Sequence, residues 1–269
     1  MSSFLCLFLK RLEIILISWY NYYSFKRKVK IMLFYFMRHA DPIYHPDSLT
    51  PLGHRQAEAL AKRLCVYGFD KIYSSTSTRA LMTAQPTCEI LKKDLVQLDW
   101  CNEHHAWLQL TALNEDGRRK WLFAHEPTIK LFNSSEIRQL GKNWYEHKAF
   151  EGTTYKEGIL RIQNESDALF ESLGYKHVPE KGGYLKIAPT EERVALFAHA
   201  GFGAAFLSCL LDIPYPLFST RFDISHSSMT VIEFENSYDV VIPRVLTFSN
   251  DSHLYKEGLP TKYNNRIYI

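Results

Sequence analysis

The chain has 269 residues, of which 46% are apolar and 23% are charged. This composition excludes a disordered protein, a collagen-like repeat and a small disulfide scaffold, and the length suffices for one large α/β domain. The net charge is +3, but six basic residues and one acid among residues 1–31 account for all of the positive excess. The slightly acidic remainder is not a generic nucleic-acid binder, because it cannot release counterions from phosphates.

The first 31 residues are predicted to lie outside the folded domain. Their apolar stretch is interrupted by Lys10 and Arg11, so it is too short for a membrane span, and its basic cluster at 26–30 follows the apolar part instead of preceding it. We expect a disordered or peripheral extension, or an upstream mis-start. An interfacial membrane anchor is the less favoured alternative.

The five cysteines are scattered along the chain without a Cys-x-x-Cys pair. An odd number of unpaired thiols is typical of a reducing compartment, so we expect a cytoplasmic protein with buried thiols and no disulfide framework.

From Met32 onward, apolar runs and helical patterns alternate. Strands are expected at 33–37, 70–73, 96–100, 183–187, 193–198, 229–234 and 240–248, the last two as a hairpin-like pair that closes the sheet. Helices are expected at 51–67, 79–92, 161–174 and 203–211. The alternation predicts an α/β domain over 32–269, a three-layer sandwich with a mostly parallel central sheet and helices on both faces. Residues 104–182 are predicted to form a mostly helical cap insertion.

Five side chains follow predicted strands, where ligands of α/β sheets bind: Arg38, His39, Arg79, Glu103 and His199. Glu103 is expected in a loop. Arginine is the preferred bidentate partner of phosphate, and histidine can form a covalent intermediate. A carboxyl group can protonate a leaving alkoxide and then activate water. This set suits phosphoryl transfer through phosphohistidine, and no cluster with metal-ligand spacing is visible, so no metal and no cofactor are expected.

The same residues lie in motifs that resemble those of the histidine phosphatase (phosphoglycerate mutase-like) superfamily. Phe36-Met-Arg-His-Ala-Asp-Pro42 is similar to its Arg-His-Gly motif. Residues 49–57, 72–84 and 197–201 resemble three further motifs, and the likeness extends over roughly 33–250. The resemblance implies that His39 accepts the phosphoryl group and that Arg38, Arg79 and His199 form the phosphate pocket. Glu103 is implied as the general acid and base.

Some positions depart from the family pattern. Ala40 and Ala200 replace glycines, so the backbone approach to the phosphate could differ there, and His45 replaces a frequent asparagine. Asp99 and Glu115 remain alternatives for the proton donor.

The resemblance implies a metal-independent phosphomonoesterase that acts on a small phosphorylated metabolite, with the cap determining the substrate. One alternative is a phosphoglycerate mutase, which would need a bisphosphorylated cofactor and a basic cap; Arg118, Arg119 and Lys120 could supply the charge. The other alternative is a catalytically inactive protein that binds a phosphorylated ligand.

Overall fold

The computed structural model describes residues 30–261, and the compact part of the chain begins at Ile31. The expected extension therefore lies outside the described residues except for its last two. The first strand, β1 (Ile31–Arg38), includes the expected strand at 33–37 and begins one residue before Met32, the expected start of the domain. Within residues 30–261, no helix is long and apolar enough to cross a membrane.

A six-stranded sheet forms the centre of the fold, in the order β13-β11-β1-β10-β4-β5. The bounds of the strands that join β1 are β4 (Lys71–Ser75), β5 (Leu95–Leu98), β10 (Arg193–Ala198), β11 (Met229–Glu235) and β13 (Arg244–Asn250). β1 pairs in parallel with β10, β10 with β4, and β4 with β5. β11 is antiparallel to both of its neighbours. Because one strand of the six runs against the others, the predicted mostly parallel sheet is confirmed.

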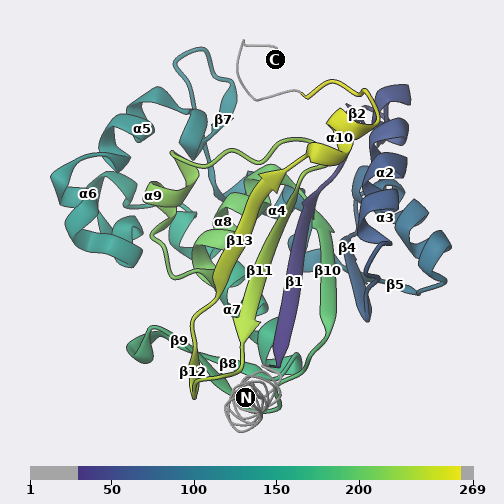
Figure 1. The fold of residues 1–269 in the computed structure, drawn as a ribbon. Coiled ribbons are helices and arrows are strands. Elements are labelled where there is room, and N and C mark those ends of the chain that lie inside the picture. Colours follow the sequence, from purple (N-terminus) through teal and green to yellow (C-terminus); the bar gives the residue numbers. More distant parts are fainter. Residues whose placement is uncertain (1–29, 262–269) are drawn as a thin grey trace, which may run out of the picture. The chain divides into compact units, whose positions relative to one another are not determined.

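Helices cover both faces of this sheet, as predicted (Figure 1). On one face lie α2 (Pro51–Leu64) and α3 (Thr78–Leu91), and on the other α4 (Glu103–Gln109), α7 (Tyr155–Ser172) and α8 (Ala200–Leu210). The alternation of side chains along β1 explains the two layers. Phe34 and Phe36 pack with α7 and α8, whereas Met37 packs with Leu60 of α2 and Cys88 of α3.

The start of α2 follows from local chemistry. The Thr50 hydroxyl accepts a hydrogen bond from the amide of Gly53, and Pro51 is the first helical residue, where its missing N–H costs nothing. Gly53 also permits a close approach, because a Cβ there would lie 2.2 Å from the carbonyl oxygen of Asp41. The helix is thereby held against the loop that leaves β1, and it ends at Leu64, before the expected Tyr67.

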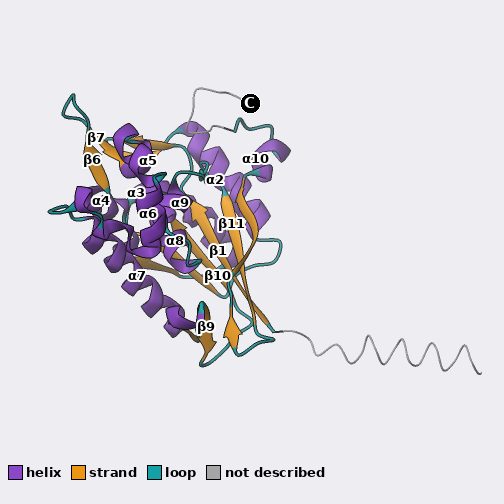
Figure 2. Cartoon of the chain, turned by 90° about the vertical axis from the view of Figure 1, so that its left-hand side faces the viewer, coloured by secondary structure: helices purple, strands orange, loops and turns teal. Residues whose placement is uncertain are grey.

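The segment expected as a helical cap is more varied than its composition indicated. It contains α4, α5 (Glu126–Phe132), α6 (Ser135–Leu140) and α7, several 3-10 turns, and an unpredicted hairpin of β6 (Thr111–Leu113) and β7 (Arg119–Trp121). α7 belongs to a helical layer of the sandwich and not to a cap, because its Phe170 packs on the sheet: the ring centres of Phe170 and Phe34 are 5.0 Å apart. Figure 2 shows the hairpin and α5 at the end of the domain opposite β9 (Gly183–Lys186).

Two further strand predictions need correction. The expected strand at 183–187 does not join the central sheet, since β9 pairs with β8 (Tyr175–Val178) and β12 (Val240–Val241) in a separate three-stranded sheet. The expected strand at 240–248 is consequently divided, and its second part, β13, pairs with β11 from Arg244 onward. Short elements complete the fold: β2 (Pro42–Tyr44), β3 (Asp47–Leu49), α9 (Tyr215–Ser219) and α10 (Ser252–Lys256).

Candidate active site

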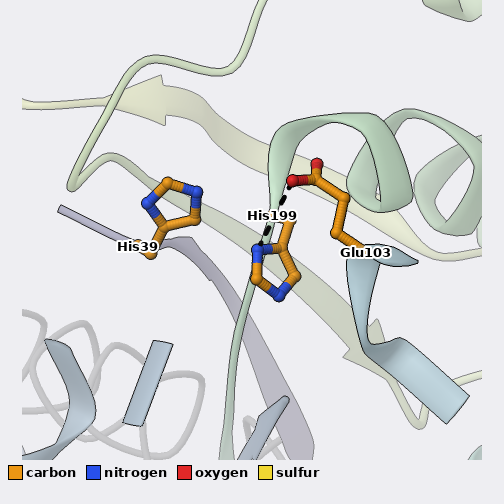
Figure 3. Close-up of side chains that lie close together, drawn as sticks. All are labelled: His39, Glu103 and His199. Atoms are coloured by element: carbon orange, nitrogen blue, oxygen red, sulfur yellow. Dashed lines mark ion pairs between the residues drawn. The ribbon is translucent and has the colours of Figure 1, made fainter. Parts of the chain in front are cut away.

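Parallel pairing of β1 with β10 brings the two histidines together. Arg38 is the last residue of β1 and is in register with Ala198, the last residue of β10. His39 directly follows β1 and His199 directly follows β10, and their rings lie 5.2 Å apart, centre to centre (Figure 3). The expected convergence at the carboxyl edge of the sheet is therefore what the structure shows.

The ring of His39 is held in one orientation by a backbone contact. Its Nδ1 lies 2.8 Å from the carbonyl oxygen of Ala40. A carbonyl can only accept, so Nδ1 carries the proton and Nε2 keeps its lone pair in the neutral ring. Burial lowers the pKa of His39 well below its ordinary value, and the neighbouring His199 and Arg38 lower it further. The geometry therefore presents a neutral imidazole whose Nε2 carries no proton.

His199 is neutral for the same physical reasons. Burial lowers its pKa well below the ordinary value, with further contributions from Arg79 and Arg38. Its Nδ1 accepts a hydrogen bond from Arg79 at 3.2 Å, because a guanidinium can only donate. Its Nε2–H then donates to the hydroxyl of Ser75 at 2.8 Å. In this tautomer the lone pair of Nδ1 faces the Arg79 guanidinium.

Glu103 is the first residue of α4, not a loop residue as predicted. The helix begins there because the side chain of Asn102 accepts a hydrogen bond from the amide of His104, an N-cap that was not recognised. Glu103 Oε1 accepts from the amide of Gly201 at 3.0 Å, and Oε2 accepts from Arg79 at 3.2 Å. Oε2 also lies 3.7 Å from His199 Nδ1, the approach dashed in Figure 3.

The two alternative acids lie elsewhere. The side chain of Asp99 is 71% exposed and bonds to Thr76 and His105. Glu115 is exposed in the turn of the β6–β7 hairpin. Glu103 is consequently the carboxylate that the fold places beside the histidines.

The two arginines lie at this edge with distinct partners. Arg79 Nη1 donates to Asp47 at 2.9 Å, while Nη2 donates to both Glu103 and His199. Arg38 Nη2 lies 2.7 Å from His226 Nε2, which must accept. Asp47 and His226 are functional candidates that sequence reasoning missed.

A topological signal could have identified His226. It lies just before β11, whose antiparallel course puts its start at the same edge as the carboxyl ends of the parallel strands. The ring of His226 is 5.5 Å from that of His39. Asp47, by contrast, reaches Arg79 from the short β2–β3 hairpin, and no spacing rule predicts that contact.

The replaced glycines have different surroundings. Ala40 is fully buried and packs with Leu49 and Ala57, whereas Ala200 lines the cavity beside the site. The next residue must be glycine, because a Cβ on Gly201 would lie 2.3 Å from the indole of Trp121. His45, the third departure, lines a second cavity beside the site.

Two cavities adjoin the site. The first, of 610 Å³, is lined by Arg38 and by residues of α8 and of the loop after α9. The second, of 650 Å³, is lined by Arg79 and by residues of α4 and of the β2–β3 hairpin. Tyr44, Glu103 and Trp121 line both cavities, so Glu103 is reached from either side.

One donor atom from each of His39, Glu103 and His199 lies within 4.8 Å of the others, a spacing that could hold a metal ion. Two guanidinium groups, which can bind an anion, lie beside the same three residues. Arg79 already donates to Glu103 and to His199, and Arg38 adjoins the same pocket. Two fixed guanidinium charges repel a divalent cation and match the oxygens of a phosphate.

These features place two histidines, two arginines and one carboxylate together at the carboxyl edge of an α/β sheet. In a comparison with known families, residues 34–131 match the family described as the histidine phosphatase superfamily (branch 1). The resemblance to that superfamily is thus confirmed. No curated protein sequence matches the chain.

Solved structures of similar fold cover more of the chain. A phosphoserine phosphatase mutant from Entamoeba histolytica, in complex with phosphoserine, has a TM-score of 0.51 and 17% identity, with coverage of 83% of this chain and 99% of its own. A mycobacterial glucosyl-3-phosphoglycerate phosphatase with inorganic phosphate has a TM-score of 0.52 and 21% identity, with coverage of 82% and 98%. At these identities the likeness shows a shared fold.

Proposed function

We propose that this protein is a metal-independent phosphomonoesterase that hydrolyses a small phosphorylated metabolite through a phosphohistidine at His39. The observation that carries the proposal is the locked tautomer of His39. Its Nδ1–H donates a hydrogen bond to the Ala40 carbonyl, so Nε2 carries the lone pair of the ring and lies beside Arg38 and Glu103. The family match and the phosphatases of similar fold support a phosphatase enzyme.

In the first half-reaction, His39 Nε2 attacks phosphorus and the bond from phosphorus to the ester oxygen breaks. Arg38 and Arg79 hold the equatorial oxygens, and His199 can donate to one of them once its Nδ1 is protonated or its tautomer changes. Glu103, in its acid form, gives its proton to the leaving oxygen, which departs as an alcohol.

In the second half-reaction, the Glu103 carboxylate takes a proton from water and the oxygen attacks the phosphoryl group. The phosphorus–nitrogen bond breaks, its electron pair returns to Nε2, and inorganic phosphate leaves. Glu103 is then protonated again, ready for the next ester, so atoms and charges balance over the cycle.

The structure favours hydrolysis over mutase activity. Arg118 pairs with Asp116, Arg119 donates to Thr111, and Lys120 is exposed, all on or beside β7. None of the three basic residues lines either of the two cavities at the site. Among residues 30–261, Arg221 is the one lysine or arginine besides Arg38 and Arg79 that lines either cavity, so a second phosphate or a carboxylate would meet few cations there.

We further propose a reducing location such as the cytoplasm. The four cysteines within residues 30–261 are free thiols, and burial raises the pKa of Cys101 and of Cys209 to about 12. Such thiols are poor nucleophiles and resist oxidation.

The decisive test is trapping of the intermediate. The wild-type protein, quenched during turnover of p-nitrophenyl phosphate, should contain acid-labile, base-stable phosphate at His39, and His39→Gln should lose both the label and nearly all turnover. His54→Gln is the matched control, because His54 is exposed on α2. A label that persists in His39→Gln would contradict the assignment, and wild-type protein without label or hydrolysis would favour an inactive ligand-binding protein.

A further inference from the structure

The proton donor and an aromatic side chain meet at the first turn of α8. The amide of Gly201 donates to Glu103 Oε1 at 3.0 Å. The indole of Trp121 lies over the same residue, where a Cβ would come within 2.3 Å of its ring. The oxygen that Glu103 protonates belongs to the leaving group, so the leaving group must begin next to Trp121.

Trp121 belongs to an aromatic wall of the first cavity. Phe123 is stacked parallel to it, with ring centres 5.8 Å apart and an angle of 7° between the planes. Phe222, which lines the same cavity, is 46% exposed. Aromatic rings exposed within a concave site are typical of contact with an apolar ligand, since their burial against one is favourable.

In the part of this cavity that lies away from Arg38, positive and negative side chains offset each other. Arg221 and Asp223 both line it and have opposite charges. The Arg221 guanidinium already donates to Asn133 and to Thr220. A leaving group with its own carboxylate or phosphate therefore gains little here, whereas an uncharged aromatic group can pack against the rings of Trp121, Phe123 and Phe222.

We propose that the substrate is a phosphomonoester whose alcohol bears an aromatic or similarly planar apolar group, packed against Trp121 and Phe123. This inference rests on the proposed phosphatase activity and specifies the class of its substrate. It disfavours esters of small polar alcohols, which have no apolar surface to pack along the rings of Trp121 and Phe123.

Matched substrates test the inference without a difference in leaving-group chemistry. 2-Phenylethyl phosphate and ethyl phosphate both release a primary alcohol, so the phosphoryl transfer step is intrinsically similar. We expect kcat/KM for the phenylethyl ester to be higher by at least about tenfold, because one hydrophobic increment in a fitted pocket is worth that much. Equal values for the two esters would overturn the inference.

Variants locate the binding wall. Trp121→Ala should reduce the ratio of the two kcat/KM values toward one, and Phe123→Ala should reduce it in part. Trp107→Phe is the control, because Trp107 lines the second cavity and contacts Trp121 edge-on, a contact that phenylalanine can retain. A ratio that falls for Trp107→Phe and not for Trp121→Ala would place the leaving group in the second cavity and overturn the inference.

Inhibition of the wild-type protein gives a reading that does not depend on how the variants fold. Phenylphosphonate should inhibit p-nitrophenyl phosphate hydrolysis at a concentration at least about tenfold lower than methylphosphonate. Equal inhibition contradicts the aromatic wall while the phosphatase assignment stands. No hydrolysis of any ester and no phosphohistidine would refute the proposed function itself.

Discussion

Replacement of Glu103 by glutamine separates proton transfer from phosphate binding. The two carboxylate oxygens accept from different donors, the Gly201 amide and the Arg79 guanidinium. A glutamine side chain has the same length but only one acceptor, so its NH₂ must face one of those donors. The variant loses one hydrogen bond to a charged group at a side chain that is 15% exposed, which costs about 1–3 kcal/mol of local stability.

The catalytic loss should exceed this and should depend on the leaving group. General acid–base assistance is worth roughly 10²–10⁴-fold, or about 3–5 kcal/mol of activation free energy. An alkyl phosphate needs its leaving oxygen protonated, so its hydrolysis should fall by that whole factor. p-Nitrophenolate leaves without a proton, so transfer to His39 should be affected less. Since water activation still needs the base, phosphoenzyme should accumulate with this substrate.

Rapid-quench measurement of phosphoenzyme and steady-state rates with both esters form the assay. Asp99→Asn is the matched control, because Asp99 is an exposed acid in the turn just before α4. This variant should change neither the ratio of the alkyl and aryl hydrolysis rates nor the amount of phosphoenzyme. Equal losses for the alkyl and the aryl ester, without accumulation, would refute the role of Glu103 in proton transfer and leave it a positioning residue.

Four further predictions test other parts of the structure. EDTA should leave the activity unchanged. A loss of activity that a divalent ion restores would mean that His39, Glu103 and His199 hold a metal ion. His226→Ala should raise KM more than it lowers kcat, because Arg38 Nη2 loses the partner that orients it, although Nη1 keeps its hydrogen bond to the Ile224 carbonyl. His226→Gln, which can still accept a hydrogen bond, should restore part of the loss, unlike a variant that merely unfolds. Burial lowers the pKa of His177, but hydrogen bonds to two aspartates outweigh this and raise it to about 9. The charged ring is therefore favoured in the folded state, and its contribution, complete below pH 6.5, should be lost as pH rises through about 9. This amounts to about 2–3 kcal/mol of unfolding free energy by urea titration, and a profile that is flat in this window, or unchanged in His177→Gln, would contradict it. A chain that begins at Lys30 retains all of β1 and every proposed site residue, so its kcat/KM should equal that of the full chain, and a folded but inactive product would show that the preceding segment is needed.

Local signals in the sequence were sufficient for the framework of the site. The apolar run of β1, the Thr50–Pro51 helix start and the small-residue helix after His199 each depend on contacts within a few residues, so pattern and capping chemistry reveal them. The strand pattern also predicted that His39 and His199 lie at one edge of the sheet, because each follows a strand and parallel strands end at the same edge.

Contacts between distant segments decided the rest. Glu103 was expected in a loop but is the first residue of α4, because the side chain of Asn102 caps the start of that helix. The division of 240–248 between two sheets depends on β9, which is more than fifty residues away in the chain, and no local pattern reports that partner.

The chemistry of the site is also a tertiary property. The sequence supplied the residue types, but the tautomer of His39 depends on one carbonyl, and the lowered pKa values of both histidines depend on burial. His226 reaches Arg38 only because β11 runs antiparallel to β1. Trp121, at the end of β7, lies over Gly201 although Gly201 is eighty residues later in the chain. Helix and strand preferences are encoded within a few residues, whereas proton positions, pKa values and cavity walls arise only when segments distant in sequence exclude water from one another.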